Sequence, residues 1–86
     1  MTNKPEEITV TFNLFELKMR LQSYLGAEIS WAEMSRQSGV NQNTLTNLLH
    51  NKARRVDLET LERLVGYFRS QGLDVTHADL FLTKLE

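Results

Sequence analysis

Residues 30–49, SWAEMSRQSGVNQNTLTNLL, contain two short helical patterns on either side of one glycine. Ser30 followed by Glu33 is a capping box, which predicts the start of a helix. Gly39 ends that helix, because glycine adopts the left-handed backbone conformation without a Cβ clash. Asn41 is a good cap for the next helix, which follows almost at once. Two short helices are therefore expected to meet across a turn.

The residues around this turn have the chemistry that a helix-turn-helix requires. A small residue at Ser35 allows the two helices to cross closely. The second helix is held against the core by three apolar side chains, Val40, Leu45 and Leu48. The opposite face of this second helix is then left free to contact another molecule.

That outer face carries amide and hydroxyl side chains with little bulk and no charge. Amides donate and accept at once, so Gln or Asn can pair with the N6 and N7 edge of adenine in the major groove of DNA. The methyl groups of Thr44 or Thr46 can contact thymine methyl groups. We therefore predict that base edges are read by Gln42, Asn43, Thr46 and Asn47.

Charge is segregated along the chain, although the net charge is only −1. Residues 34–56 contain no Asp or Glu and four basic residues, so this window carries +4 and the remainder −5. Three of the four cations, Lys52, Arg54 and Arg55, lie in the loop that follows the second helix. The edge of the groove brings DNA phosphates near such a loop, so these cations are predicted to position the domain.

Two longer helical patterns flank the central stretch. The first follows Asn13 as its cap and ends near Gly26, with an apolar stripe of Leu14, Leu17, Leu21, Tyr24 and Leu25. The second follows Asp57 as its cap, with an apolar face of Leu58, Leu61, Leu64, Val65 and Phe68. Gly66 lies inside it at a cost of about 1 kcal/mol relative to Ala. We expect a neighbouring element to pack closely at this glycine.

The two ends of the chain carry weaker patterns. Thr76 with Asp79 forms a second capping box, which predicts a fifth helix with the apolar positions Leu80, Phe81 and Leu85.

Residues 8–12 alternate apolar side chains with threonine, which is typical of a short strand. This strand either pairs with its counterpart in a second copy or is an extended lead-in that places one aromatic in the core, and we favour the lead-in. Residues 1–7 are expected to be a flexible tail, and residues 8–86 the domain.

The composition indicates one small folded domain. Apolar residues make up 41% of the 86 residues and charged residues 24%, unlike a disordered chain.

There is no cysteine, and His50 and His77 lie on different predicted helices, so we expect no metal and no cofactor. No nucleophile elbow or phosphate-binding loop is present, so we predict no enzymatic activity. Without a long apolar run or a signal-like start, we expect a cytoplasmic location. The aromatic residues interpreted as core are Phe12, Phe15, Trp31, Phe68 and Phe81.

The sequence SWAEMSRQSGVNQNTLTNLLHNK, followed by RRVDLETLERLVGYF, resembles the Cro/repressor-type (Xre-like) helix-turn-helix family. The resemblance spans about Leu14 to Phe81. It implies an all-α, compact, five-helix domain like that of lambda repressor, here with a short extended or β N-terminal segment. It also implies binding to operator double-stranded DNA, usually as a homodimer, and regulation of transcription.

The resemblance places functional roles on particular residues. Base-reading positions of the family fall on Gln42, Asn43 and Asn47, and phosphate-contacting ones on Asn41, Lys52 and Arg54 or Arg55. Three positions depart from the usual family residues, with Trp31 in place of Gln, Ser35 in place of Ala, and Asn51 in place of Gly. An indole can donate one hydrogen bond to a phosphate or pack in the core, and Asn can adopt the left-handed conformation. The full set assigned to phosphate is Asn41, Thr44, Asn51, Lys52, Arg54, Arg55 and Trp31.

A second interpretation keeps the same fold but makes the domain a protein-binding module, such as an antitoxin or an accessory subunit of a larger complex. The net acidity and the predicted strand favour it. Between the two interpretations we favour a DNA-binding transcriptional repressor. The candidate surfaces for a homodimer are the strand at Ile8 to Phe12 and the C-terminal apolar stretch from Leu80 to Leu85.

Overall fold

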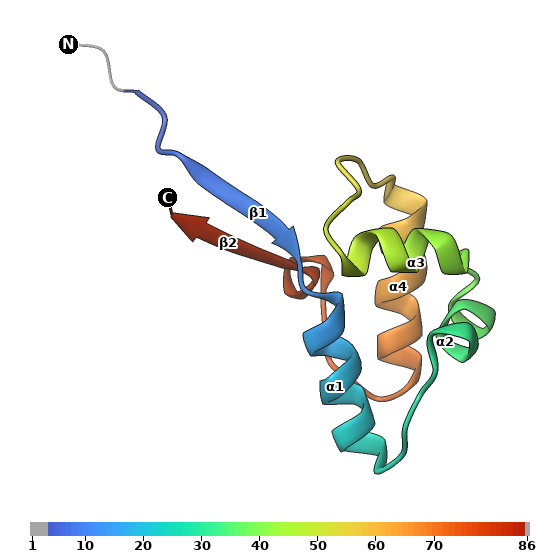
Figure 1. Ribbon diagram of the computed structural model, residues 1–86. Coiled ribbons are helices and arrows are strands. Elements are labelled where there is room, and N and C mark those ends of the chain that lie inside the picture. The colour runs from blue at the N-terminus through green and yellow to red at the C-terminus, as the bar shows by residue number, and fades with distance from the viewer. Residues whose placement is uncertain (1–3, 86) are drawn as a thin grey trace.

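The computed structural model describes residues 4–85, and Figure 1 shows a helical body from which a two-stranded ribbon projects. The elements in chain order are β1 (Ile8–Phe12), α1 (Leu14–Leu25), α2 (Trp31–Ser38), α3 (Gln42–Leu49), α4 (Leu58–Ser70), the 3-10 turn η1 (His77–Leu80) and β2 (Phe81–Leu85). Residues 1–3 of the predicted tail lie outside the described residues. Residues 4–7 are exposed and have no regular secondary structure. The division into a tail and a domain of residues 8–86 stays a prediction.

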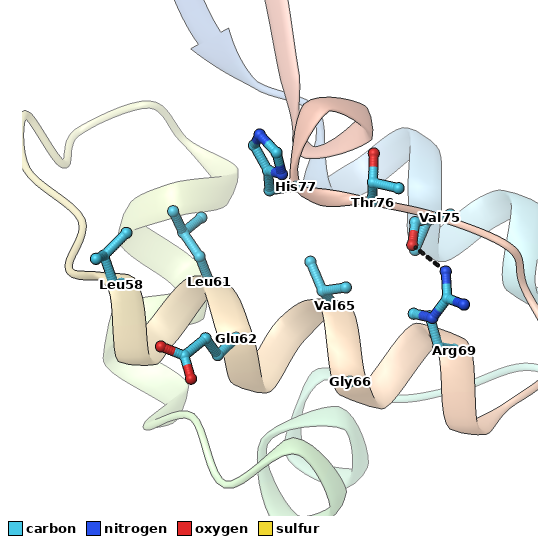
Figure 2. A pocket seen from close by; sticks show the side chains of 9 residues that line it. All are labelled: Leu58, Leu61, Glu62, Val65, Gly66, Arg69, Val75, Thr76 and His77. Carbon is cyan, nitrogen blue, oxygen red and sulfur yellow. Dashed lines mark hydrogen bonds between the residues drawn. The ribbon is translucent and has the colours of Figure 1, made fainter.

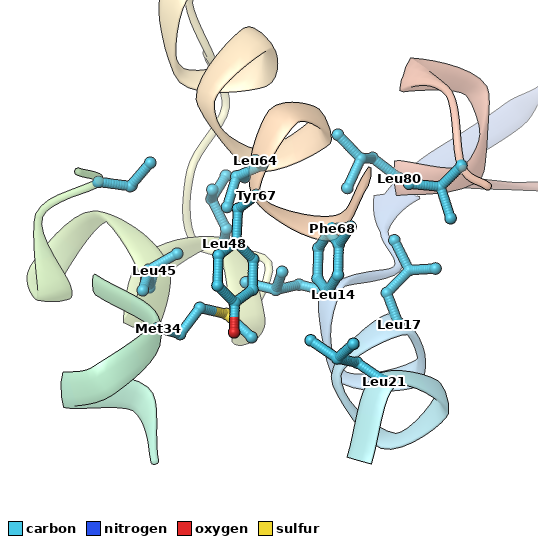
Figure 3. Packing of buried hydrophobic residues seen from close by; sticks show 12 residues of the cluster. Leu14, Leu17, Leu21, Met34, Leu45, Leu48, Leu64, Tyr67, Phe68 and Leu80 are labelled. Atoms are coloured by element: carbon cyan, nitrogen blue, oxygen red, sulfur yellow. The ribbon is translucent and has the colours of Figure 1, made fainter. Parts of the chain in front are cut away.

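All four α-helices of the described chain contribute to one apolar core. Figure 3 shows α3 and α2 meeting α4 on one side of this core and α1 meeting it on the other. The predicted anchors of the turn, Val40, Leu45 and Leu48, are all buried. The other buried apolar side chains are Leu14, Leu17, Leu21, Met34, Leu64, Tyr67, Phe68, Val75 and Leu80.

Both central helices begin where the sequence predicts, and α2 ends at the predicted glycine. Ser30 Oγ accepts a hydrogen bond from the Glu33 backbone N–H at 3.1 Å, and Asn41 Oδ1 accepts one from the Asn43 N–H at 2.8 Å. Gly39 ends α2 in the left-handed conformation with φ 77°. The capping box at the start of α2 is only half formed, because the Glu33 carboxylate pairs with side chains further along the helix.

The prediction of a fifth helix is wrong. Its capping box forms, with the Thr76 backbone N–H donating to Asp79 Oδ2 at 2.8 Å, but it opens only the single turn η1. The chain then continues as β2, which pairs antiparallel with β1 so that Phe81 lies opposite Phe12 and Leu85 opposite Ile8. Pairing gives both end segments backbone hydrogen-bond partners, and it lets alternate apolar side chains of the two strands share one face.

The strand at Ile8–Phe12 is confirmed. One of its edges pairs with β2 of the same chain, a partner that the sequence did not predict, and pairing with a second copy stays a prediction. The Phe12 ring does pack against the core and meets the Phe81 ring edge-on at 5.1 Å between centroids. The ribbon is therefore fixed to the body at its inner end.

Some side chains of the predicted apolar stripes are exposed. Tyr24 and Leu25 at the end of α1 and Leu58 at the start of α4 point outside the core. The interpretation of Phe15 as a core aromatic is wrong, because this side chain is exposed too. The fold is too small to cover every apolar position on helices that have solvent on their outer sides. Asn13 makes no side-chain cap for α1. Its backbone N–H instead donates to the Leu80 carbonyl at 2.7 Å, which joins the start of α1 to η1.

The expectation of close packing at Gly66 is also wrong, because a Cβ built there would meet no atom within 4 Å. The groove beside this glycine on α4 is apolar and has a volume of about 640 Å³. Figure 2 shows the segment 75–77 lying across from α4 at this groove. Gly66→Ala is therefore expected to raise the free energy of unfolding by about 0.5–1 kcal/mol, since Ala favours the helix and restricts the unfolded chain. Urea denaturation would measure the change.

The matched control is Gly72→Ala, which should destabilise the protein. Gly72 has φ 107°, and a Cβ there would lie 2.8 Å from the Tyr24 ring. A destabilising effect of Gly66→Ala would contradict the open surroundings of that position.

Candidate nucleic-acid interface

The outer face of α3 gathers the four predicted base-reading side chains. Gln42, Asn43, Thr46 and Asn47 are all exposed, while Leu45 and Leu48 on the inner side are buried. Among residues 4–85 the side-chain amides of Gln42, Asn43 and Asn47 have no hydrogen-bond partner. Thr46 Oγ1 donates to the Gln42 carbonyl at 3.0 Å, so its methyl group is the part left for an apolar contact. The face offers three unengaged amides and one methyl group.

Three of the residues predicted to contact phosphate are already partly engaged within the protein, namely Trp31, Asn41 and Thr44. Trp31 is half-buried against the core, and the Lys18 Nζ lies 4.8 Å from the centre of its ring in a cation–π contact. The Asn41 side-chain oxygen caps α3, and Thr44 is half-buried. Trp31 is therefore a packed residue whose ring N–H is its one donor.

The basic loop leaves α3 through Asn51, which has φ 56° and so adopts the predicted left-handed conformation. Asn51 Oδ1 accepts a hydrogen bond from the Phe12 backbone N–H at 2.8 Å, which fixes the loop to β1. Lys52, Arg54 and Arg55 are exposed, and within residues 4–85 none of them forms an ion pair. The loop is anchored at one end while its three cations face solvent.

The fourth cation of the basic window is engaged elsewhere. Arg36 forms an ion pair with Glu33, which also accepts a hydrogen bond from Gln37. The hydrogen bond from Arg36, and secondarily that from Gln37, lowers the pKa of Glu33, and the same pair raises the pKa of Arg36. The positive charge available to a ligand is therefore concentrated on the loop rather than on α2.

One residue that positions the turn was not predicted. Arg63 on α4 donates from Nη1 to the Gly39 carbonyl at 2.7 Å, and its guanidinium also pairs with Glu59. This bond ties α4 to the turn between α2 and α3. No local pattern marks Arg63, because its partner is a backbone oxygen 24 residues away in the chain.

In the part of the chain that the structure describes, no three His, Asp or Glu side chains gather closely enough to bind a metal ion. None of the described helices is long and apolar enough to span a membrane. Within residues 4–85, α3 and the basic loop together make an exposed surface that combines unengaged amides with unpaired cations.

A family model described as the Cro/C1-type HTH DNA-binding domain matches residues 20–81. The match includes α2, α3, the basic loop and α4, and so every residue assigned above to bases or phosphates. It leaves out β1, the first half of α1 and nearly all of β2. No curated protein and no solved structure matches the chain.

Proposed function

The chain belongs to the family of Cro/C1-type helix-turn-helix DNA-binding domains, and from this we propose that it binds specific double-stranded DNA sites and represses transcription from them. The observation that carries the proposal is the position of the unengaged amides on the exposed face of α3, directly beside the three unpaired cations of the basic loop. Repression follows if the bound domain occupies a site that the transcription machinery needs.

In this proposal α3 enters the major groove and its outer face reads base edges. Gln42, Asn43 and Asn47 supply bidentate amides, which favour adenine, and Thr46 supplies a methyl group for thymine. The residues proposed for phosphate are Asn41, Thr44, Asn51, Lys52, Arg54, Arg55 and Trp31. Asn51 would use its amide nitrogen, because its side-chain oxygen is bound to β1.

One α3 covers only a few base pairs, so useful specificity requires two copies on half-sites about 34 Å apart. We propose a homodimer on such a pair of sites. A cytoplasmic location and the absence of enzymatic activity complete the proposal.

The direct test is selection of binding sites from a pool of random duplex DNA at two salt concentrations, followed by sequencing. A motif that survives the higher salt would support sequence-specific binding, because non-specific phosphate binding weakens steeply as salt rises. If no duplex is bound even at low salt, the proposal of DNA binding fails.

Neutralising the loop cations one at a time, by Lys52→Gln, Arg54→Gln or Arg55→Gln, is expected to weaken binding to all DNA sequences alike. Each variant should reduce the slope of log affinity against log salt by about one, because one fewer counterion is released. Fluorescence anisotropy at several salt concentrations would measure it. Arg20→Gln, an exposed cation on α1, is the matched control and should keep the slope of the natural chain.

The net charge of −1 and the projecting ribbon favour a second candidate function, a protein-binding module such as an antitoxin or an accessory subunit. Under this alternative, the three loop variants would keep the protein's activity, and a partner protein would co-purify with the chain. Loss of DNA affinity in those variants, with no partner retained, would contradict it.

A further inference from the structure

The ribbon of β1 and β2 has two unlike faces. Residues directly opposite in an antiparallel pair lie on the same side of the sheet. The register therefore places on one side Ile8, Val10, Phe12, Phe81, Thr83 and Leu85, which we call the apolar ribbon face. The other side carries Thr9, Thr11, Leu82 and Lys84. The apolar ribbon face bears no charge.

The apolar ribbon face is covered at its inner end and open at its outer end. Phe12 and Phe81 pack against the core, whereas Val10 is 52% exposed, Ile8 50% and Leu85 73%. Figure 1 shows the outer half of the ribbon standing clear of the helices. A two-stranded ribbon is only marginally stable in water by itself, so it gains from a partner that covers this face.

A pocket of about 480 Å³ lies where the ribbon meets the basic loop. Its apolar lining includes Val10, Phe12 and Phe81 from the ribbon, with Leu48, Ala53 and Val56 from the body. Arg54 and Arg55 also line it. The chain thus carries a protruding apolar pair, Ile8 and Leu85, at one end of the ribbon and a pocket with a partly apolar lining at the other.

We propose that a second copy of the chain covers the apolar ribbon face, with the two ribbons packed face to face and running in opposite directions. Two-fold symmetry then sets Val10 against Val10 and brings each outer pair, Ile8 and Leu85, to the other copy's pocket. Because the face is uncharged, two identical copies meet without repulsion. This proposal rests on the dimer put forward under the proposed function, and the apolar ribbon face lies almost wholly outside the family match.

This arrangement has a geometry suited to two half-sites. A five-residue ribbon is about 17 Å long, with one helical body at each end of the shared pair. The two bodies would therefore be held apart along the shared ribbons, as binding to two half-sites about 34 Å apart requires. The filled pocket also supports the loop that carries Arg54 and Arg55, so dimer formation would hold two proposed phosphate contacts in place.

The shared surface is small, so the free protein is expected to dimerise weakly. Two ribbons of this length bury on the order of several hundred Å² per copy, at the low end for specific interfaces. A dissociation constant on the order of micromolar is the expected result.

Sedimentation equilibrium of the full chain without DNA tests the inference. Val10→Lys and Leu85→Lys should each raise the dimer dissociation constant about 100-fold or more, because they bury a cation in an apolar contact, and at position 10 set two like charges against each other. Leu82→Lys is the matched control and should keep the natural constant, because Leu82 lies on the opposite face of the ribbon, is 51% exposed and does not line the pocket. Far-ultraviolet circular dichroism checks that each variant is folded, and the highly exposed Leu85 keeps the test valid if Val10→Lys unfolds.

A natural chain that stays monomeric at hundreds of micromolar would overturn the inference. So would a dimer that survives both lysine variants at the apolar ribbon face, an outcome that would indicate the groove along α4 or the free edge of β1 instead. Binding to a duplex with a single half-site separates this result from the proposed function. Folded monomeric variants should still bind one half-site, whereas a failure of DNA binding itself would remove that binding from the natural chain as well.

Discussion

Leu45→Ala is expected to lower the free energy of unfolding by about 2–5 kcal/mol, the range measured for truncating buried leucines. Leu45 is 0% exposed and places the inner side of α3 in the core that it shares with Met34 of α2 and Leu64 of α4 (Figure 3). A domain of this size has a total stability of about 4–13 kcal/mol. The loss would therefore be a large part of the total, and urea denaturation followed by circular dichroism would measure it.

The control is Asn47→Ala, two residues further along the same helix but on its outer face. This change should leave stability within about 0.5 kcal/mol, because an exposed side chain without partners contributes little. It should instead reduce binding to the preferred DNA site. If Leu45→Ala and Asn47→Ala had equal effects on stability, the orientation of α3 described above would be wrong.

The central helices could be predicted because their signals are local. The caps at Ser30 and Asn41 and the glycine at position 39 each act within a few residues, and each boundary agrees with the structure. The fate of the C-terminal segment depends on a partner about 70 residues earlier in the chain, since β2 forms only by pairing with β1. A capping box at Thr76 correctly predicts the first turn but carries no information about that distant pairing.

The exposed face of α3 could also be predicted, because helical periodicity is a local signal as well. Helical periodicity is sufficient to place Gln42, Asn43 and Asn47 opposite Leu45 and to make them exposed. Periodicity does not reveal which polar atoms are already engaged by distant groups.

Two bonds illustrate this limit. Asn51 gives its side-chain oxygen to the Phe12 N–H, 39 residues away, and Arg63 holds the Gly39 carbonyl from α4. Both bonds exist only in the folded chain, and both determine how the candidate interface is held.

The double variant Gln42→Ala, Asn43→Ala is expected to remove most of the preference for the selected DNA site. Each lost bidentate contact costs about 1–3 kcal/mol of discrimination, so two independent contacts would cost about 2–6 kcal/mol. Stability should change little, because both side chains are exposed and the cap on α3 uses the Asn43 backbone N–H rather than its amide. Affinity for the selected site and for random duplex, measured side by side, gives the discrimination directly.

The salt dependence of binding shows whether the double variant has lost contacts to bases or contacts to phosphates. If Gln42 and Asn43 read bases, the double variant should keep the salt slope of the natural chain, because its loop cations still contact phosphates. Gln37→Ala is the matched control, since Gln37 is also an exposed amide but lies on α2, where its side chain contacts Glu33 and Gln71. Equal losses on selected and random DNA would show that the two amides contact the backbone, and the base-reading role would then pass to Thr46 and Asn47 or to another surface.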